Sequence, residues 1–181
     1  MRKTVTSRGS LFFEVNMEYQ SLVHPFGPLY DENSRVLILG SFPSVKSRQQ
    51  NFFYGHPQNR FWKVVAALTE EAVPATIEEK QQLLHSHGIA LWDTIASCDI
   101  VGSSDSSIKN VVPNDLSLIL QTANIQQIYT NGATSGKMFH RYQERTLERE
   151  AICLPSTSPA NAAWSVDRLV ETWSQMKMYL L

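Results

Sequence analysis

Cysteine is scarce in this sequence and long apolar runs are missing. Two cysteines, Cys98 and Cys153, occur in 181 residues. They are too few for a disulfide framework or for an iron–sulfur cluster held by four thiolates, so we expect both to be small buried residues. No apolar run approaches the roughly 20 residues that a membrane helix needs, and the first residues lack the apolar core of a signal peptide. We therefore expect a cytoplasmic protein without an iron–sulfur cluster or a membrane partner.

Three familiar catalytic signatures are also missing. The segment "GATSGKM" (132–138) has three residues between its glycines, where a phosphate-binding loop needs four, and Met138 stands where a Ser or Thr would bind magnesium. No GxSxG elbow of a serine hydrolase occurs. His85 and His87 have no Cys or Asp nearby to complete a metal site. The sequence therefore implies neither a metal nor another cofactor.

The composition is that of an ordinary globular protein, with 43% apolar and 18% charged residues. We expect a flexible tail over residues 1–20 and a single domain over residues 21–181. The net charge of −1 argues against a protein that coats nucleic acid indiscriminately. Residues 33–69, however, contain no acidic side chain and carry five basic ones: Arg35, Lys46, Arg48, Arg60 and Lys63. This segment could be a solvated face or could meet an anionic partner.

Apolar patterns and turn signals predict strands that alternate with helices. Strands are expected over residues 35–39, 88–95, 125–130 and 151–155, and helices over residues 60–69, 76–85, 113–123, 132–145 and 162–180. This alternation predicts an α/β fold of three layers, α/β/α, with a central, mostly parallel four-stranded sheet. Ligands bind at the carboxyl ends of such strands, which brings together residues 40–59, 92–94, 130–132 and 155–161.

The first of these segments is rich in rings and amides. Phe52, Phe53 and Tyr54 are consecutive aromatics on a positively charged loop, and such rings offer faces on which nucleic-acid bases stack. Asn59 stands where it could either cap the following helix or present its amide near the strand end. Stacking aromatics on a basic loop favour a nucleic-acid ligand.

Two motifs in this region carry a resemblance to a known family. "GSFPS" (40–44) with "YGHPQNRFWKV" (54–64), followed by "LPSTSPANA" (154–162), resembles the two signature segments of the uracil-DNA glycosylase superfamily. Within it, the sequence is most similar to the hypoxanthine-DNA glycosylase branch, also called DNA-deoxyinosine glycosylases. The resemblance covers residues 24–180. It implies a monofunctional DNA glycosylase that hydrolyses the N-glycosidic bond of deaminated bases, hypoxanthine first and uracil second, in base excision repair.

The resemblance also implies roles for individual residues. Most of the superfamily has an Asp or Asn where this chain has Phe42, and the hypoxanthine branch takes its catalytic amide from the position of Asn59. Tyr54 matches the ring that stacks on the flipped base. Main-chain amides from Ser41 to Ser44 are the expected donors to the base oxygen.

Two further polar groups could read the base edge. Asp93 aligns with the position that does so in uracil-specific relatives, although an Asp there could equally cap a turn. Asn131, at the next strand exit, is the weaker candidate.

The second motif implies contact with double-stranded DNA. Its polar residues are expected to bind phosphates and its proline to act as a wedge in the minor groove: Ser156, Thr157, Ser158, Asn161 and Pro159. Lys46 and Arg48 add positive charge beside the first motif. We expect the protein to act as a monomer.

Two other functions stay open at this stage. The fold could serve as a catalytically silent DNA- or nucleotide-binding module, because the usual catalytic side chain is replaced at Phe42. A nucleoside hydrolase would need a cluster of carboxylates for calcium or for sugar hydroxyls, and the sequence shows no such cluster. The joint presence of Asn59, Tyr54 and Asp93 favours the glycosylase.

Overall fold

A computed structural model describes residues 18–181 of the chain. The tail expected over residues 1–20 therefore falls mostly outside the described residues, and Gln20 already begins a strand. Within residues 18–181, no helix is long and apolar enough to cross a membrane.

The centre of the molecule is a sheet of four parallel strands. It contains β2 (Val36–Gly40), β3 (Ile89–Asp93), β6 (Gln127–Asn131) and β7 (Ala151–Leu154), in the order β3-β2-β6-β7. The apolar runs that form β2 and β3 are buried over their whole length, as expected for parallel strands covered on both faces. The four predicted strands and their parallel arrangement are confirmed.

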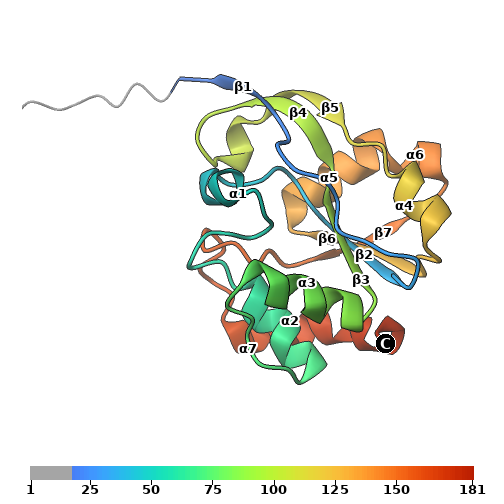
Figure 1. Cartoon of the computed structure of the whole chain (residues 1–181). Helices are drawn as coiled ribbons and strands as arrows, with labels where there is room; N and C mark the ends of the chain where they lie inside the picture. The colour runs from blue at the N-terminus through green and yellow to red at the C-terminus, as the bar shows by residue number, and fades with distance from the viewer. Residues whose placement is uncertain (1–17) are drawn as a thin grey trace, which may run out of the picture.

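Helices cover both faces of this sheet. On one side lie α2 (Phe61–Thr69), α3 (Ile77–Ser86), α7 (Val166–Trp173) and the 3₁₀ helix η2 (Ser174–Tyr179), and on the other lie α4 (Ser117–Thr122), α5 (Ala133–Tyr142) and α6 (Glu144–Leu147) (Figure 1). The side chain of Trp173 is fully buried on the α7 side, where its ring lies edge-on to Phe61 of α2. The predicted three-layer α/β/α fold is confirmed.

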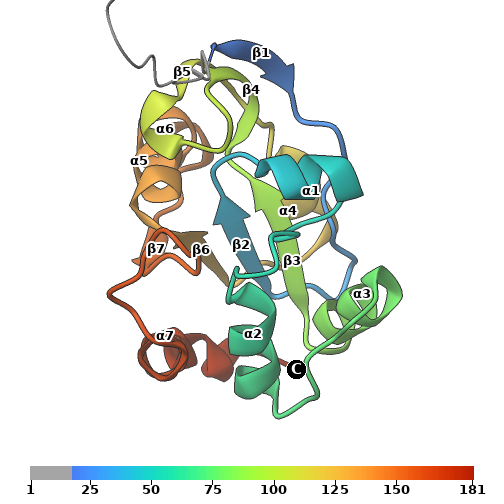
Figure 2. The same cartoon turned by 90° about the vertical axis from the view of Figure 1, so that its left-hand side faces the viewer.

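A second, smaller sheet was not predicted. It is antiparallel, in the order β1-β4-β5, and consists of β1 (Gln20–Val23), β4 (Ile95–Ile100) and β5 (Lys109–Pro113). Only Thr94 separates β4 from β3, and no turn signal in the sequence marks that boundary. Strand β5 is largely exposed and follows a short 3₁₀ helix, η1 (Asp105–Ser107). Figure 2 shows this sheet beyond the tip of β2.

The two cysteines differ in their surroundings. Cys98 on β4 is buried, as predicted, and burial raises the pKa of its thiol to about 11. Cys153 is exposed on the edge strand β7, so the prediction that it is buried is wrong. An edge strand is covered on fewer sides than a central one, which the local sequence does not reveal.

Candidate active site

A cavity of about 550 Å³ opens at the carboxyl ends of β2, β3 and β6. Its walls come from residues 40–47, 53–59, 103–106 and 156–160, together with Asp93 and Asn131. All four segments expected to meet at this edge of the sheet contribute to it. Residues 103–106 are an addition that the sequence did not indicate. A cavity of this size suits a small organic group such as one nucleobase.

The ring of Tyr54 forms one wall and is rigidly backed. Its centroid lies 4.0 Å from that of Phe61, with 18° between the ring planes, so one face of Tyr54 is covered and the other is left for a ligand. Tyr54 also has a φ of 51°, an uncommon conformation for a bulky residue. The structure thus fixes this ring in place before any ligand binds.

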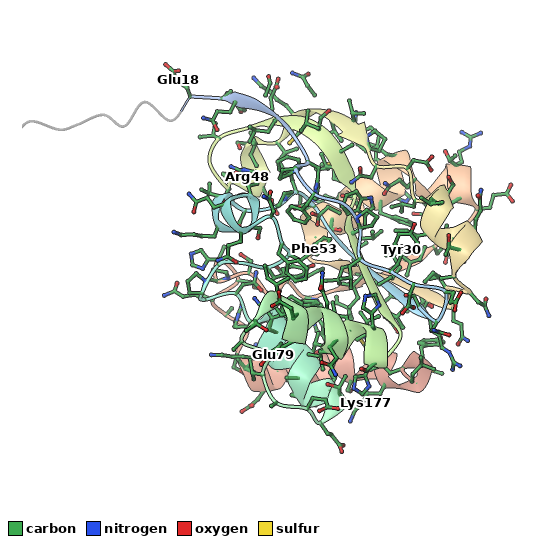
Figure 3. All side chains as sticks on the ribbon, viewed as in Figure 1. Glu18, Tyr30, Arg48, Phe53, Glu79 and Lys177 are labelled. Carbon is green, nitrogen blue, oxygen red and sulfur yellow. The ribbon has the colours of Figure 1, made fainter. Side chains whose placement is uncertain are left out.

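The other two rings of the aromatic run are less available. Phe52 is buried and stacks on Trp62, so it belongs to the core rather than to a base-binding surface. Phe53 is also buried, although it contributes to the wall of the cavity. In the view of Figure 3 it lies in the interior, between α1 (Val45–Gln50) and α3. Of the three consecutive aromatics, Tyr54 is therefore the candidate for stacking.

The hydroxyl of Tyr54 is buried without a hydrogen-bond partner among the described residues. Burial raises its pKa well above the usual range, and the charge of Asp93 raises it further, while the nearby side chain of Asn131 opposes the shift. The hydroxyl therefore stays protonated and lies within electrostatic reach of Asp93.

Asn59 holds the start of α2 and also faces the cavity. Its Oδ1 accepts hydrogen bonds from the main-chain N–H of Phe61 (2.9 Å) and from the hydroxyl of Thr157 (2.9 Å). Because the N–H of Phe61 can only donate, the atom it contacts must be the amide oxygen. Nδ2 makes no hydrogen bond to residues 18–181, so the side chain presents N–H donors to the cavity.

Thr157 joins the two sequence motifs through a buried network. Its side chain is fully buried; its Oγ1 accepts from Asn131 Nδ2 (2.9 Å), and its N–H donates to Asn131 Oδ1 (3.0 Å). Its own hydroxyl proton goes to Asn59. The hydroxyl of Thr157 is therefore already used inside the protein, where it fixes Asn59 and Asn131 relative to each other. It is not free for the expected contact with a DNA phosphate.

Arg60 locks the second motif against the first. Its guanidinium donates to the carbonyl oxygens of Thr157 (3.2 Å), Ser158 (2.6 Å), Asn161 (3.0 Å) and Trp164. In the sequence Arg60 counted only as one more positive charge in a basic segment. The structure shows that its donors are used inside the protein, where they shape the loop over residues 156–161.

Asp93 is buried at the end of β3 in a tight pair with a residue that the sequence did not indicate. Its Oδ2 lies 2.6 Å from Nε2 of His24, and the two side chains are 6% and 3% exposed. The other oxygen, Oδ1, lies so close to Gly40 that the Cβ of any larger residue at position 40 would overlap it. Asp93 also lines the cavity, so one oxygen is held by His24 while the other is left near the ligand space.

The loop after β2 supplies main-chain donors at the same edge. Ser44 caps α1 by accepting from the N–H of Ser47 (3.2 Å), whereas the N–H groups of Phe42 and Ser44 have no partner among residues 18–181. The ring of Phe42 is buried beside Ile95 and Cys98, so this position supplies an apolar wall in place of a polar side chain.

Asp105 is a second carboxylate in the cavity wall that the sequence did not single out. Its Oδ1 accepts from the hydroxyl of Ser41 (3.1 Å). The residue as a whole is exposed, but burial of its carboxyl group raises the pKa of Asp105, and the charge of Asp93 raises it too. It was missed because it lies in a polar segment without periodicity.

Replacing Asp105 with Asn should stabilise the folded protein at neutral pH. A carboxyl whose pKa is raised on folding contributes most below its unfolded pKa, and this contribution is lost as the pH rises through the folded pKa. We therefore expect Asp105→Asn to raise Tm by a few degrees at most at pH 7, with the gain shrinking toward pH 4. Thermal melting across this range checks it, and a gain independent of pH would contradict the ionisation argument.

Some of the remaining residues predicted to contact DNA already form hydrogen bonds inside the protein, and others do not. Lys46 is exposed on α1, whereas the guanidinium of Arg48 donates to the carbonyls of Pro43 (2.7 Å) and Gly102 (3.3 Å). Ser156, Ser158 and Pro159 line the rim of the cavity, and Asn161 donates to the carbonyl of Ser156 (3.0 Å). The DNA contacts of all these residues stay predictions, and Arg48 and Asn161 also hold the loops that carry them: Lys46, Arg48, Ser156, Ser158, Pro159 and Asn161.

Comparison with known proteins identifies the family. The model of the uracil DNA glycosylase superfamily matches residues 28–177. The chain belongs to this superfamily. Two curated relatives, from Methanosarcina acetivorans and Methanosarcina barkeri, are both named hypoxanthine DNA glycosylase. They are 34% and 32% identical over 79% and 75% of this chain, which corresponds to 90% and 86% of the relatives.

A solved structure supports the same assignment. The solution NMR structure of a protein from Methanosarcina acetivorans, provisionally named a uracil DNA glycosylase, has 32% sequence identity and a TM-score of 0.74. The match covers 86% of this chain and 97% of that protein. Membership of the superfamily makes this chain a DNA glycosylase, and DNA is its substrate.

Proposed function

We propose that this DNA glycosylase removes hypoxanthine, the deaminated form of adenine, from double-stranded DNA as a monomer, in the first step of base excision repair. The observation that carries the proposal is the placement of Asn59, Tyr54 and Asp93 around one cavity of nucleobase size. The names of the two similar Methanosarcina proteins support the same substrate. Uracil, whose ring N–H and carbonyl are arranged alike, is a second substrate candidate.

The damaged nucleotide has to leave the helix before it reaches the cavity. Extrusion costs a few kcal/mol and costs least for a mispaired base such as inosine. The free face of Tyr54 then holds the base by stacking, supported from behind by Phe61. The rim formed by Ser156, Ser158 and Pro159 lies where it can contact the flanking phosphates and the minor groove.

Cleavage of the glycosidic bond leaves positive charge on the sugar and negative charge on the base. Preorganised N–H donors stabilise the departing base, and we assign this task to the main-chain N–H groups of Phe42 and Ser44, which line the cavity and have no partner among residues 18–181. Asn59 holds the attacking water through Nδ2, because its Oδ1 is already occupied twice. An amide is not a strong base, so water attacks a sugar that has already developed cationic character.

Two substitutions of Tyr54 test the stacking step. We expect Tyr54→Ala to weaken excision by about 1–3 kcal/mol, since it removes the stacking face. Tyr54→Phe should be mild, because it keeps the ring and removes only a hydroxyl without a partner among the described residues. Single-turnover excision rates of both variants measure this, and equal losses in the two would assign the role to the hydroxyl instead of the ring.

The substrate is tested with a panel of duplexes that carry hypoxanthine, uracil, xanthine or a mismatched thymine at one position. Alkali cleaves the abasic site that base removal leaves. We expect cleavage at hypoxanthine after alkali and none before it, because no lysine among residues 18–181 lines the cavity to form a Schiff base. A rate for uracil or xanthine above that for hypoxanthine would change the proposed substrate.

A further inference from the structure

The pair of His24 and Asp93 is a deeply buried polar contact beside the cavity, and the steps described so far do not use His24. The ring of His24 is enclosed by Phe26, Phe42 and Trp92, whose centroids lie 4.5, 5.9 and 4.5 Å away. A histidine in such an apolar cage is costly to bury unless its polar atoms are satisfied. Both nitrogens have partners here.

The partners of the ring fix its tautomer. Nδ1 faces the main-chain N–H of Phe26 at 3.5 Å, and an N–H can only donate. The proton of a neutral His24 therefore belongs on Nε2, from which it is donated to Oδ2 of Asp93 across 2.6 Å. With the proton on Nε2, His24 donates a hydrogen bond to Asp93, and Oδ2 of Asp93 accepts it.

We infer that His24 determines the base specificity of the enzyme by holding Asp93 as a hydrogen-bond acceptor. This inference rests on the proposed function. The Watson–Crick edge of hypoxanthine has a ring N–H beside a carbonyl oxygen, so a carboxylate accepts its N1–H. Adenine has the opposite edge, with a bare N1 beside an amino group.

Without the donor, Asp93 would lose its preference for the edge of hypoxanthine. A buried carboxyl that lacks a hydrogen-bond donor takes up a proton more readily, since burial disfavours the charged form. A protonated carboxyl offers one O–H and one carbonyl oxygen, so it can pair with the edge of adenine as well as with that of hypoxanthine, and it no longer gives the N1–H of hypoxanthine a charge-assisted bond. His24 is thus a positioning residue that keeps the cavity matched to the deaminated base.

Other groups near Asp93 do not replace His24. Among residues 18–181, His24 is the one side chain that hydrogen-bonds the carboxyl group of Asp93. The two titratable groups in this part of the chain that respond to the charge of Asp93 are Tyr54 on the cavity wall and Asp105 on η1, and neither donates a hydrogen bond to that carboxyl group. Asn114 donates to the main-chain oxygen of Asp93 (2.8 Å) and not to its carboxyl group.

The test compares His24→Phe, which removes the donor but keeps an aromatic ring, with His24→Gln, whose Nε2 can donate from a similar distance. Single-turnover rates on duplexes with hypoxanthine or adenine opposite thymine are measured from about pH 5.5 to about pH 8.5. We expect His24→Gln to follow the wild-type pH profile. His24→Phe should lose at least tenfold on hypoxanthine at pH 6, regain activity as the pH rises, and discriminate less against adenine at low pH.

The outcomes separate the inference from the proposed function. A wild-type enzyme that releases no hypoxanthine contradicts the proposed function, whereas an active wild type and a His24→Phe variant with an unchanged pH profile overturn the inference alone. If His24→Phe does not fold, the inference is tested by the tautomer of His24 in the wild-type protein. ¹⁵N NMR should show a proton on Nε2, and a ring protonated on Nδ1 alone would overturn the inference.

Discussion

Asn59→Ala should abolish most base release while binding to DNA that holds an abasic site stays close to wild type. The reason is that Asn59 is a side-chain amide on the cavity wall whose Nδ2 makes no hydrogen bond within residues 18–181, at a site where the side chain of Phe42 is apolar. Removing a single preorganised donor from an enzyme site costs about 10²–10³ in rate. Single-turnover kinetics on a hypoxanthine duplex, with abasic-site binding measured separately, checks it.

Asn59→Asp is the matched control for the structural role of this residue. An aspartate can still accept from the N–H of Phe61 and from the hydroxyl of Thr157, so it should keep the start of α2 and the link between the motifs. It has no N–H to donate. We expect it to melt near the wild-type temperature and to be about as inactive as Asn59→Ala. Activity of Asn59→Ala within a few fold of wild type would show that Asn59 serves only the start of α2, whereas an active Asn59→Asp would show that holding the water does not require an N–H.

Asp93→Asn should lower hypoxanthine excision at least tenfold and narrow the discrimination against adenine. Because His24 donates to one side of the residue, the new amide should turn its oxygen toward His24 and its NH₂ toward the base. Two donors would then face each other at N1 of hypoxanthine, and a charge-assisted bond worth about 1.5–3 kcal/mol would be lost. An amide N–H could instead donate to the bare N1 of adenine.

The measurement uses identical duplexes that carry hypoxanthine, uracil or adenine opposite thymine, with thermal melting as the control for folding. If melting is unchanged and all three rates match the wild type, Asp93 serves only to end β3. The base would then be read by the main chain of residues 41–44 and by Asn131.

Much of the site followed from local sequence. The apolar run before Gly40 predicts a central strand, and parallel strands place the residues after their carboxyl ends side by side. This is why Tyr54, Asn59, Asp93 and Asn131 could be assigned to one cavity, and all four line it. Their chemical roles came from the resemblance to the family and stay proposals.

The contacts that hold these residues in place could not be predicted. His24 and Asp93 are 69 positions apart, and Arg60 reaches carbonyls about 100 positions away, so no spacing in the sequence marks either contact. The resemblance to the family's second motif made Thr157 a candidate phosphate ligand, and the local sequence does not show that the packing of the two motifs buries its side chain. Asp105 escaped notice because a polar loop gives no sign of which face it turns toward the cavity.

The central claim is that this chain releases hypoxanthine from DNA by hydrolysing the N-glycosidic bond. The most direct measurement is chromatography with mass detection of the free base released in a single turnover from a duplex that contains one deoxyinosine, with Asn59→Ala as the inactive control. The account predicts one equivalent of free hypoxanthine from the wild type and almost no free hypoxanthine from the variant. The DNA strand should stay intact until alkali is added. Release of no base by a folded wild-type protein that still binds the duplex would contradict it and would favour a silent DNA-binding module.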